Sequence, residues 1–132
     1  MSLVVDASAA VEVLLRTPTG QVVVDRLRGQ RAAAPDILDV EVASALRRAH
    51  RRGIVGDGEL SAALDVLLDL PVARVPTRLL IRGTRRWWPN VTAYDALYLG
   101  VAVGRQARVL TCDGPLARAP QADVRVENVR VH

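Results

Sequence analysis

Short runs that are apolar at nearly every position constrain the fold of this chain more than any other feature. Leu3-Val4-Val5 is the clearest run, and Arg108-Val109-Leu110-Thr111 is a second one. A strand of this kind has both of its faces covered, as strands in parallel sheets do. Segments of helical length separate these runs, and strands that alternate with helices indicate an α/β domain with a mainly parallel sheet.

Start and stop signals locate the remaining elements. Asp36, Asp57 and Thr92 are typical N-cap residues, and Pro71 and Pro89 are expected to end helices. The predicted helices cover residues 8–15, 19–28, 37–52, 57–70, 77–88 and 92–105, and the predicted strands cover residues 3–5, 32–34, 72–75, 108–111 and, at a sheet edge, 124–126.

The length of 132 residues suits a single domain, residues 1–132, with a real hydrophobic core. Phe is absent, so Val, Leu and Ala must build that core. The lone Cys112 excludes an internal disulfide and suits a reducing cytosol. Neither a signal peptide nor a membrane span is visible, so we expect a soluble, cytoplasmic protein that does not enter a membrane.

The charge of the chain indicates a partner. All 18 basic residues are arginine against 14 acidic residues, which gives a formal net charge of +4 and a pI near 10.5. A basic surface favours a polyanion, most simply nucleic acid. The alternative is a basic domain with no such partner.

Four acidic residues, in contrast, lie within or at the end of apolar segments. They are Asp6 in LVVDASAA, Glu41 in DVEVASAL, Asp95 in TAYDALYLGVAV and Asp113 in RVLTCDGP. A carboxylate removed from water must be paired, protonated or bound to a metal. Apart from Arg108 at the start of the last string, no basic residue lies within these strings, so the four acids together suggest a divalent-cation site.

Two of these acids follow strands. Asp6 ends the first strand and Asp113 follows the strand at residues 108–111, and the carboxyl ends of parallel strands meet at one edge. Strand alternation places Thr111 and Asp113 on one side and Cys112 on the other. Cys112 is therefore interpreted as a core residue and not as a nucleophile.

The other two acids lie on predicted helices, and each has a structural alternative. Glu41 borders the apolar face of its helix, and the alternative is a solvated helix edge. Thr92-Ala93-Tyr94-Asp95 matches a capping box, which alone would account for Asp95.

An acidic cluster without a matching set of His or Cys ligands selects Mg²⁺ or Mn²⁺ over Zn²⁺. Such a site suits phosphodiester hydrolysis, with arginines along the polyanion backbone. The preferred arginines are Arg82, Arg85 and Arg86, just before the Asp95 helix. An ordinary solvated face remains the alternative for the cluster Arg47, Arg48, Arg51 and Arg52, and packing is favoured over base stacking for Trp87-Trp88.

In this order and spacing the four strings resemble the PIN-domain ribonucleases, in particular VapC-type toxins, over essentially the whole chain. VVDASAAVEVLL is similar to the family's first strand with its Asp-x-Ser, and Glu41 stands where the family has its helix glutamate. TAYDALYLGVA resembles the family's most recognisable stretch, and LTCDGPLAR resembles its closing Thr-x-Asp. The resemblance implies a three-layer sandwich in which a short, mainly parallel sheet is flanked by helices.

The resemblance also implies a site and a function. Asp6, Glu41, Asp95 and Asp113 would hold Mg²⁺ or Mn²⁺, with Ser8 and Thr111 supporting the ligands, and metal-bound water would cleave RNA endonucleolytically. The partners would be a cognate antitoxin in the catalytic groove and a second copy in a homodimer. The segment after Asp113 lacks the further acids of some relatives, which leaves the number of metal ions open.

Other classes fit less well. Receiver domains need a lysine, which this chain lacks, and haloacid-dehalogenase-type phosphatases need a second Asp where this chain has Ser8. A catalytically silent PIN-like module that binds RNA or protein would be marked by missing acids, and all four are present.

Overall fold

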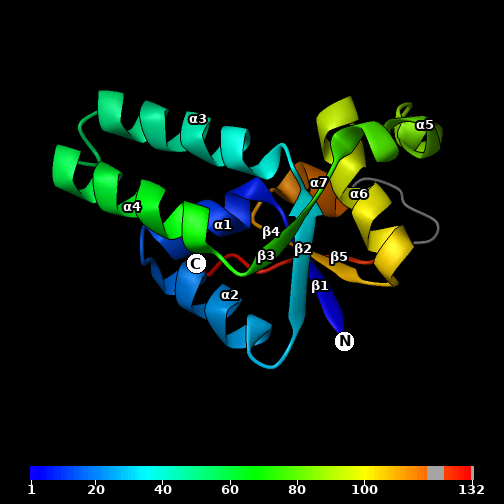
Figure 1. Ribbon diagram of the computed structural model, residues 1–132, viewed down its shortest axis with the longest axis horizontal. Helices are drawn as coiled ribbons and strands as arrows, with labels where there is room; N and C mark the ends of the chain where they lie inside the picture. The colour runs from blue at the N-terminus through cyan, green and yellow to red at the C-terminus, as the bar shows by residue number, and fades with distance from the viewer. Residues whose placement is uncertain (119–123, 132) are drawn as a thin grey trace.

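A single parallel sheet of five strands organises the chain, and the computed structural model describes residues 1–118 and 124–131 (Figure 1). Its strand order is β3-β2-β1-β4-β5, and every neighbouring pair is parallel. The strands are β1 (Ser2–Val5), β2 (Arg31–Pro35), β3 (Val72–Val75), β4 (Arg108–Thr111) and β5 (Val126–Asn128). The predicted α/β class with a parallel sheet is confirmed.

Helices cover both faces of this sheet. Figure 1 shows α6 on one side and α1 with α2 on the other, while α3 and α4 form a hairpin that extends from the body. The helices are α1 (Ala7–Leu14), α2 (Pro18–Leu27), α3 (Leu38–Arg51), α4 (Asp57–Asp69), α5 (Ile81–Thr84), α6 (Ala93–Arg105) and α7 (Gly114–Arg118). None of those in the described residues is long and apolar enough to cross a membrane.

The apolar runs form the centre of the core, as their pattern predicts. Val4 and Val109 pair in register between β1 and β4 and are fully buried. Leu46 of α3 and Leu99 of α6 are also fully buried, and burying a leucine side chain contributes about 2 kcal/mol to stability. Because the strands are covered on both faces, polar groups gather where the strands end.

Two predicted caps are wrong. Ile37 occupies the N-cap position of α3, because the N–H of Asp36 donates to the Val75 carbonyl (2.8 Å) and continues the sheet ladder. At α4 the N-cap is Gly56 and Asp57 is the first helical residue. Thr92 does cap α6, since its Oγ1 accepts from the Asp95 N–H at 3.1 Å.

The predicted helix at residues 77–88 is broken into three pieces. A 3₁₀ turn (Thr77–Leu79), α5 and a second 3₁₀ turn (Arg85–Trp87) replace it. Thr84 Oγ1 donates to the Ile81 carbonyl at 2.7 Å, and such local side-chain bonds compete with regular helix. The last strand begins two residues later than predicted but lies at the predicted edge, in register with β4.

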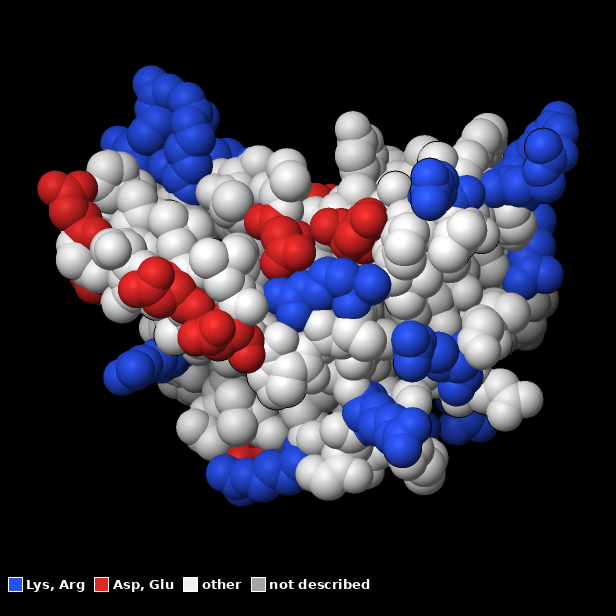
Figure 2. Space-filling view, in the orientation of Figure 1, with Lys and Arg blue, Asp and Glu red and all other residues white. Residues whose placement is uncertain are grey.

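The surface separates charge between elements. Figure 2 shows basic side chains gathered over the free end of α3 and at the α5 end of the molecule, and acidic side chains along α4. The exposed arginines of the α3 end are Arg47, Arg48, Arg51 and Arg52.

Candidate active site at the carboxyl edge of the sheet

Asp6 is placed by both elements that it joins. Its N–H donates to the Leu110 carbonyl at 3.1 Å, which extends the β1–β4 pairing. Its carboxylate is the N-cap of α1 and accepts from the Ala9 N–H at 3.1 Å. Only 5% of the residue is exposed. A carboxylate is therefore held at the carboxyl end of the central strand.

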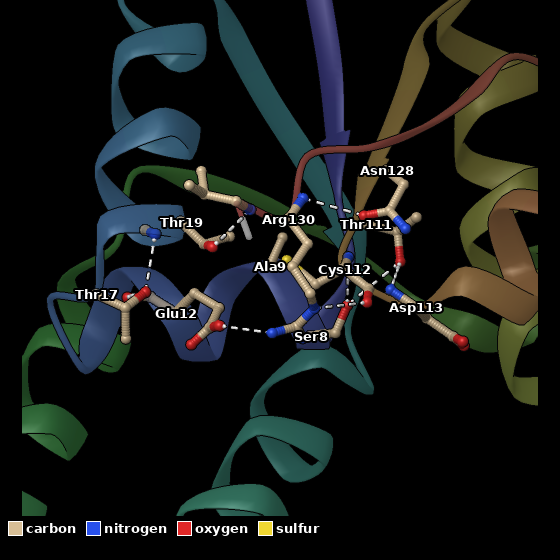
Figure 3. Close-up of polar contacts among 12 residues, drawn as sticks. Ser8, Ala9, Glu12, Thr17, Thr19, Thr111, Cys112, Asp113, Asn128 and Arg130 are labelled. Atoms are coloured by element: carbon tan, nitrogen blue, oxygen red, sulfur yellow. Dashed lines mark hydrogen bonds and ion pairs between the residues drawn. The ribbon is translucent and has the colours of Figure 1, made fainter.

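Two hydroxyl groups orient this carboxylate. Ser8 Oγ donates to Asp6 Oδ1 at 2.6 Å, and Thr111 Oγ1 donates to Asp6 Oδ2 at 2.5 Å. The same hydroxyl oxygens accept from the N–H groups of Cys112 and Asp113, each at 2.8 Å (Figure 3). Because an ionised carboxylate can only accept, the single proton of each hydroxyl points at Asp6 while the hydroxyl oxygen accepts from the backbone. The carboxylate still keeps lone pairs for a further ligand.

Burial dominates the protonation of Asp6. It raises the pKa of the carboxyl from 3.8 to about 6, and the negative charge of Asp113 adds to this rise. The hydrogen bonds from Ser8, Thr111 and Ala9 act in the opposite direction and only partly compensate. The ionised form is thus costly in the absence of a cation.

Glu41 is held by a residue that the sequence reasoning missed. Tyr98 of α6 is 2% exposed, and its hydroxyl donates to Glu41 Oε1 at 2.6 Å. Burial and the charge of Asp95 raise the pKa of Glu41, and the Tyr98 bond lowers it. Burial, Glu41, Asp6 and Asp95 raise the pKa of Tyr98, so the phenol remains a donor. Its position three residues after Asp95, on the same helix face, is the signal that identifies it.

Asp95 and Asp113 complete the set. Asp95 is half-buried in the first turn of α6, and Asp113 lies between β4 and α7. Burial raises the pKa of Asp95, and the charge of Asp113 raises it further. The charge of Asp113 also raises the pKa of Asp6, and the charge of Asp95 raises the pKa of Glu41. The structure therefore brings all four predicted acids into one region of shared negative potential.

The donor chemistry of this region suits a hard cation, although the side chains do not yet form a closed shell. Within residues 1–118 and 124–131, no hydrogen bond or ion pair joins one of the four carboxylates to an arginine or histidine. In that same part of the chain, no three Asp, Glu, His or Cys side chains lie close enough together to hold a metal ion as they stand. Binding would require the half-buried carboxylates to move inward.

Cys112 and Trp87 have structural roles, and Trp88 is exposed. The Cys112 thiol is buried, and burial is the main cause that raises its pKa to about 11, so the predicted core assignment is confirmed. Trp87 is 6% exposed and packs in the core, and the Arg86 guanidinium lies 4.2 Å from its ring centroid. Trp88 is 45% exposed.

The predicted RNA-contacting arginines lie on the elements that pack against α6. Arg82 belongs to α5, which packs on α6, and Arg85 and Arg86 form the turn that follows. All three are exposed.

Comparisons with known proteins agree with this architecture. The PIN domain profile matches residues 3–121. The chain is 38% identical to ribonuclease VapC12 of Mycobacterium tuberculosis over 96% of this chain and 98% of that protein. It is also 38% identical to ribonuclease VapC1 of the same organism, over 96% and 97% of the two chains. VapBC2 of Rickettsia felis, solved with a promoter DNA fragment, superposes with a TM-score of 0.67 at 13% identity, over 96% and 98% of the chains. The chain therefore belongs to the PIN-domain family, among the VapC ribonucleases.

Proposed function

We propose that this protein is a metal-dependent endoribonuclease and the toxin of a toxin–antitoxin pair, which inhibits translation or growth by cutting RNA. Its kinship with proteins named VapC ribonucleases supports the RNA-cleaving activity. The observation that carries the metal dependence is the convergence of Asp6, Glu41, Asp95 and Asp113 at one sheet edge, where each raises the pKa of a neighbour or has its own raised.

These four carboxylates are the proposed ligands of Mg²⁺ or Mn²⁺. When bound, such an ion lowers the pKa of a water molecule, and its positive charge stabilises the scissile phosphate. Ser8 and Thr111 hold Asp6 in a fixed orientation, and Tyr98 does the same for Glu41. The positive charge of the cation would offset the mutual repulsion of the carboxylates that hold it.

Arg82, Arg85 and Arg86 are proposed to bind the RNA backbone. Guanidinium groups form charge-assisted bonds with phosphate, and these three are exposed on the elements that pack against α6. An RNA that lies over them reaches the carboxylate edge from the α5 side.

The proposed partners are RNA, a cognate antitoxin and a second copy of this chain. The solved complex named VapBC2 supports the proposal of an antitoxin partner, since a chain of that complex shares the fold of this protein over nearly its whole length. We place the protein in the cytoplasm, where RNA and a reduced Cys112 are both expected. The chain is proposed to act as one domain, residues 1–132.

Thermal unfolding with and without Mn²⁺ tests the metal site. A ligand that binds only the folded state raises the midpoint, by about 2.7 kcal/mol of stability at one hundred times its Kd. We expect a concentration-dependent rise for the wild type and for Asp65→Asn, an exposed α4 acid, and a strongly reduced rise for Asp95→Asn. Equal midpoints at millimolar Mn²⁺ would contradict the proposal.

Cleavage of a single-stranded RNA separates the enzyme from its alternative. The wild type with Mn²⁺ should cut internally, while Asp6→Asn should lose at least about a hundredfold in rate. RNA that is bound by the wild type but remains intact would favour a catalytically silent binding module.

A further inference from the structure

The amino-terminal edge of the sheet, opposite the carboxylate site, contains a cavity of about 600 Å³. It opens where β1 and β4 begin and where α6 ends, and its lining includes Leu3, Arg108 and Gln106. A volume of this size lies within the range of small-molecule pockets, roughly 300–1,000 Å³. The proposed nuclease chemistry does not use it.

Positive charge dominates this cavity. Arg26 of α2, Arg108 of β4 and Arg125 before β5 all line it. The nearby carboxylate is Glu127, which accepts from both Arg26 and Arg108. These bonds lower the pKa of Glu127 and keep it ionised. One carboxylate against three guanidinium groups leaves two positive charges in excess.

The guanidinium groups also retain unused donors. Arg26 spends two N–H groups on Glu127 and Arg108 spends one, out of five on each side chain. Arg125 is exposed, and its guanidinium makes no ion pair with another described residue. Glu127 thus anchors two of the arginines in place while leaving their other donors for an anion, and preorganised forks of this kind suit phosphate.

The rest of the lining is suited to a flat, mostly apolar group with polar edges. Ala102, Val103 and Ala107 supply apolar surface, and Gln30 and Gln106 supply amide groups. Gln106 is held in the left-handed region at φ 51°, which is uncommon for a residue other than glycine. Phosphate-binding arginines next to apolar and amide surface match the parts of a nucleotide.

We propose that this cavity binds a nucleotide through its phosphate monoester, with the base against the apolar wall. The ligand is either a free mononucleotide or the 5′-phosphorylated end of an RNA chain, which present the same chemistry. The site lies at the opposite ends of the two strands that carry Asp6 and Thr111, so its occupancy does not require the carboxylate site. The proposal stands independently of the nuclease activity.

Titration of the full-length protein with 5′-AMP in the presence of EDTA tests this proposal, because removal of divalent metals prevents nucleotide binding at the carboxylate edge. We expect a saturable rise of the unfolding midpoint with 5′-AMP, a smaller rise with inorganic phosphate and none with adenosine. Arg125→Glu should weaken 5′-AMP binding about tenfold or more, and Arg125→Lys should restore part of it. Arg47→Glu, an exposed arginine of α3, is the matched control and should have no effect.

Two short RNAs distinguish the source of the phosphate. If a 5′-phosphorylated oligomer competes with 5′-AMP and the competition depends on Arg125, the ligand is an RNA end. If only free mononucleotides compete, the ligand is a mononucleotide. Equal competition by a 5′-hydroxyl oligomer would overturn the assignment to a phosphate monoester. No midpoint shift at millimolar 5′-AMP, or a shift that Arg125→Glu leaves unchanged, would overturn the site itself.

Discussion

At the scale of the residue, the carboxylates of the site serve local structure and chemistry together. Asp6 ends β1, caps α1 and lies close enough to Asp113 for the negative charge of Asp113 to act on it. The same burial that positions it raises its pKa to about 6. A carboxyl group with a raised pKa lowers the free energy of unfolding of the metal-free protein at neutral pH.

The pKa of Asp6 predicts a decline of metal-free stability with pH. Because the folded pKa of about 6 exceeds the ordinary 3.8, the contribution of Asp6 is fully present below about pH 4 and is lost as the pH rises through 6, and it amounts to ~3 kcal/mol. Asp6→Asn should therefore remove this decline and unfold at higher denaturant concentration at pH 7. The measurement is denaturant unfolding in EDTA between pH 4 and 7.

Asp65→Asn, which changes an exposed acid, is the control for the loss of one charge and should keep the wild-type slope. The prediction is wrong if Asp6→Asn shows that slope as well.

Tyr98→Phe should weaken both the fold and the metal site. It deletes the donor to Glu41 Oε1 and leaves a half-buried acceptor unpaired, at a cost of about 1 kcal/mol. Because this bond lowers the pKa of Glu41, its loss should raise that pKa further. The acid limb of the cleavage profile should then move to higher pH, and the Mn²⁺-dependent midpoint shift should shrink.

Tyr94→Phe is the matched control, since Tyr94 lies on the same helix and is 63% exposed. Unchanged pH profiles in both variants would leave Tyr98 with a packing role only.

At the scale of the element, the close crossing of α1 and α2 depends on one glycine. A Cβ at Gly20 would lie 2.1 Å from the Glu12 carbonyl oxygen and 2.9 Å from Val13 Cα. Both neighbours are backbone atoms, so they cannot rotate away. Asp6 is the N-cap of α1. The crossing of α1 and α2 therefore helps to fix the position of Asp6.

Gly20→Ala should accordingly destabilise the fold, by about 3 kcal/mol, because the helices must separate. Gly104→Ala near the end of α6 is the control: its Cβ would meet nothing within 4 Å, and it should be neutral or stabilise by up to about 1 kcal/mol. Chemical denaturation of the two variants measures the difference. Equal free energies of unfolding would show that the crossing can relax.

At the scale of the whole molecule, acidic and basic side chains occupy different surfaces. The carboxyl edge collects four acids without an arginine partner among the described residues, and exposed arginines lie on α3 and on the elements that pack against α6. Such a division suits a polyanion that is held by its backbone while a cation screens the reactive edge.

Replacing Arg82 and Arg85 with alanine should flatten the salt dependence of RNA binding. Each lost phosphate contact on a single strand lowers the slope of log K against log salt by about 0.7, so the pair should lower it by about 1.4. Binding is measured in the Asp95→Asn background to prevent cleavage. Arg47→Ala with Arg48→Ala is the control pair, and an identical slope in both pairs would place the RNA elsewhere.

Features that depend on neighbouring residues could be predicted from the amino-acid order. The covered strands, the Thr92 cap and the position of Asp6 after β1 all follow from patterns within a few residues. Parallel strands align their carboxyl ends, so the meeting of Asp6 with Asp113 was predictable as well.

Long-range packing decided the rest. Asp36 fails as a cap because β3 recruits its backbone, and the segment at residues 77–88 breaks where Thr84 and Trp87 are drawn into the core. The Tyr98–Glu41 bond joins residues 57 positions apart, and the basic cavity joins Arg26 to Arg108 and Arg125. No local pattern encodes such contacts, because they form only when the sheet orders its strands and brings remote segments together.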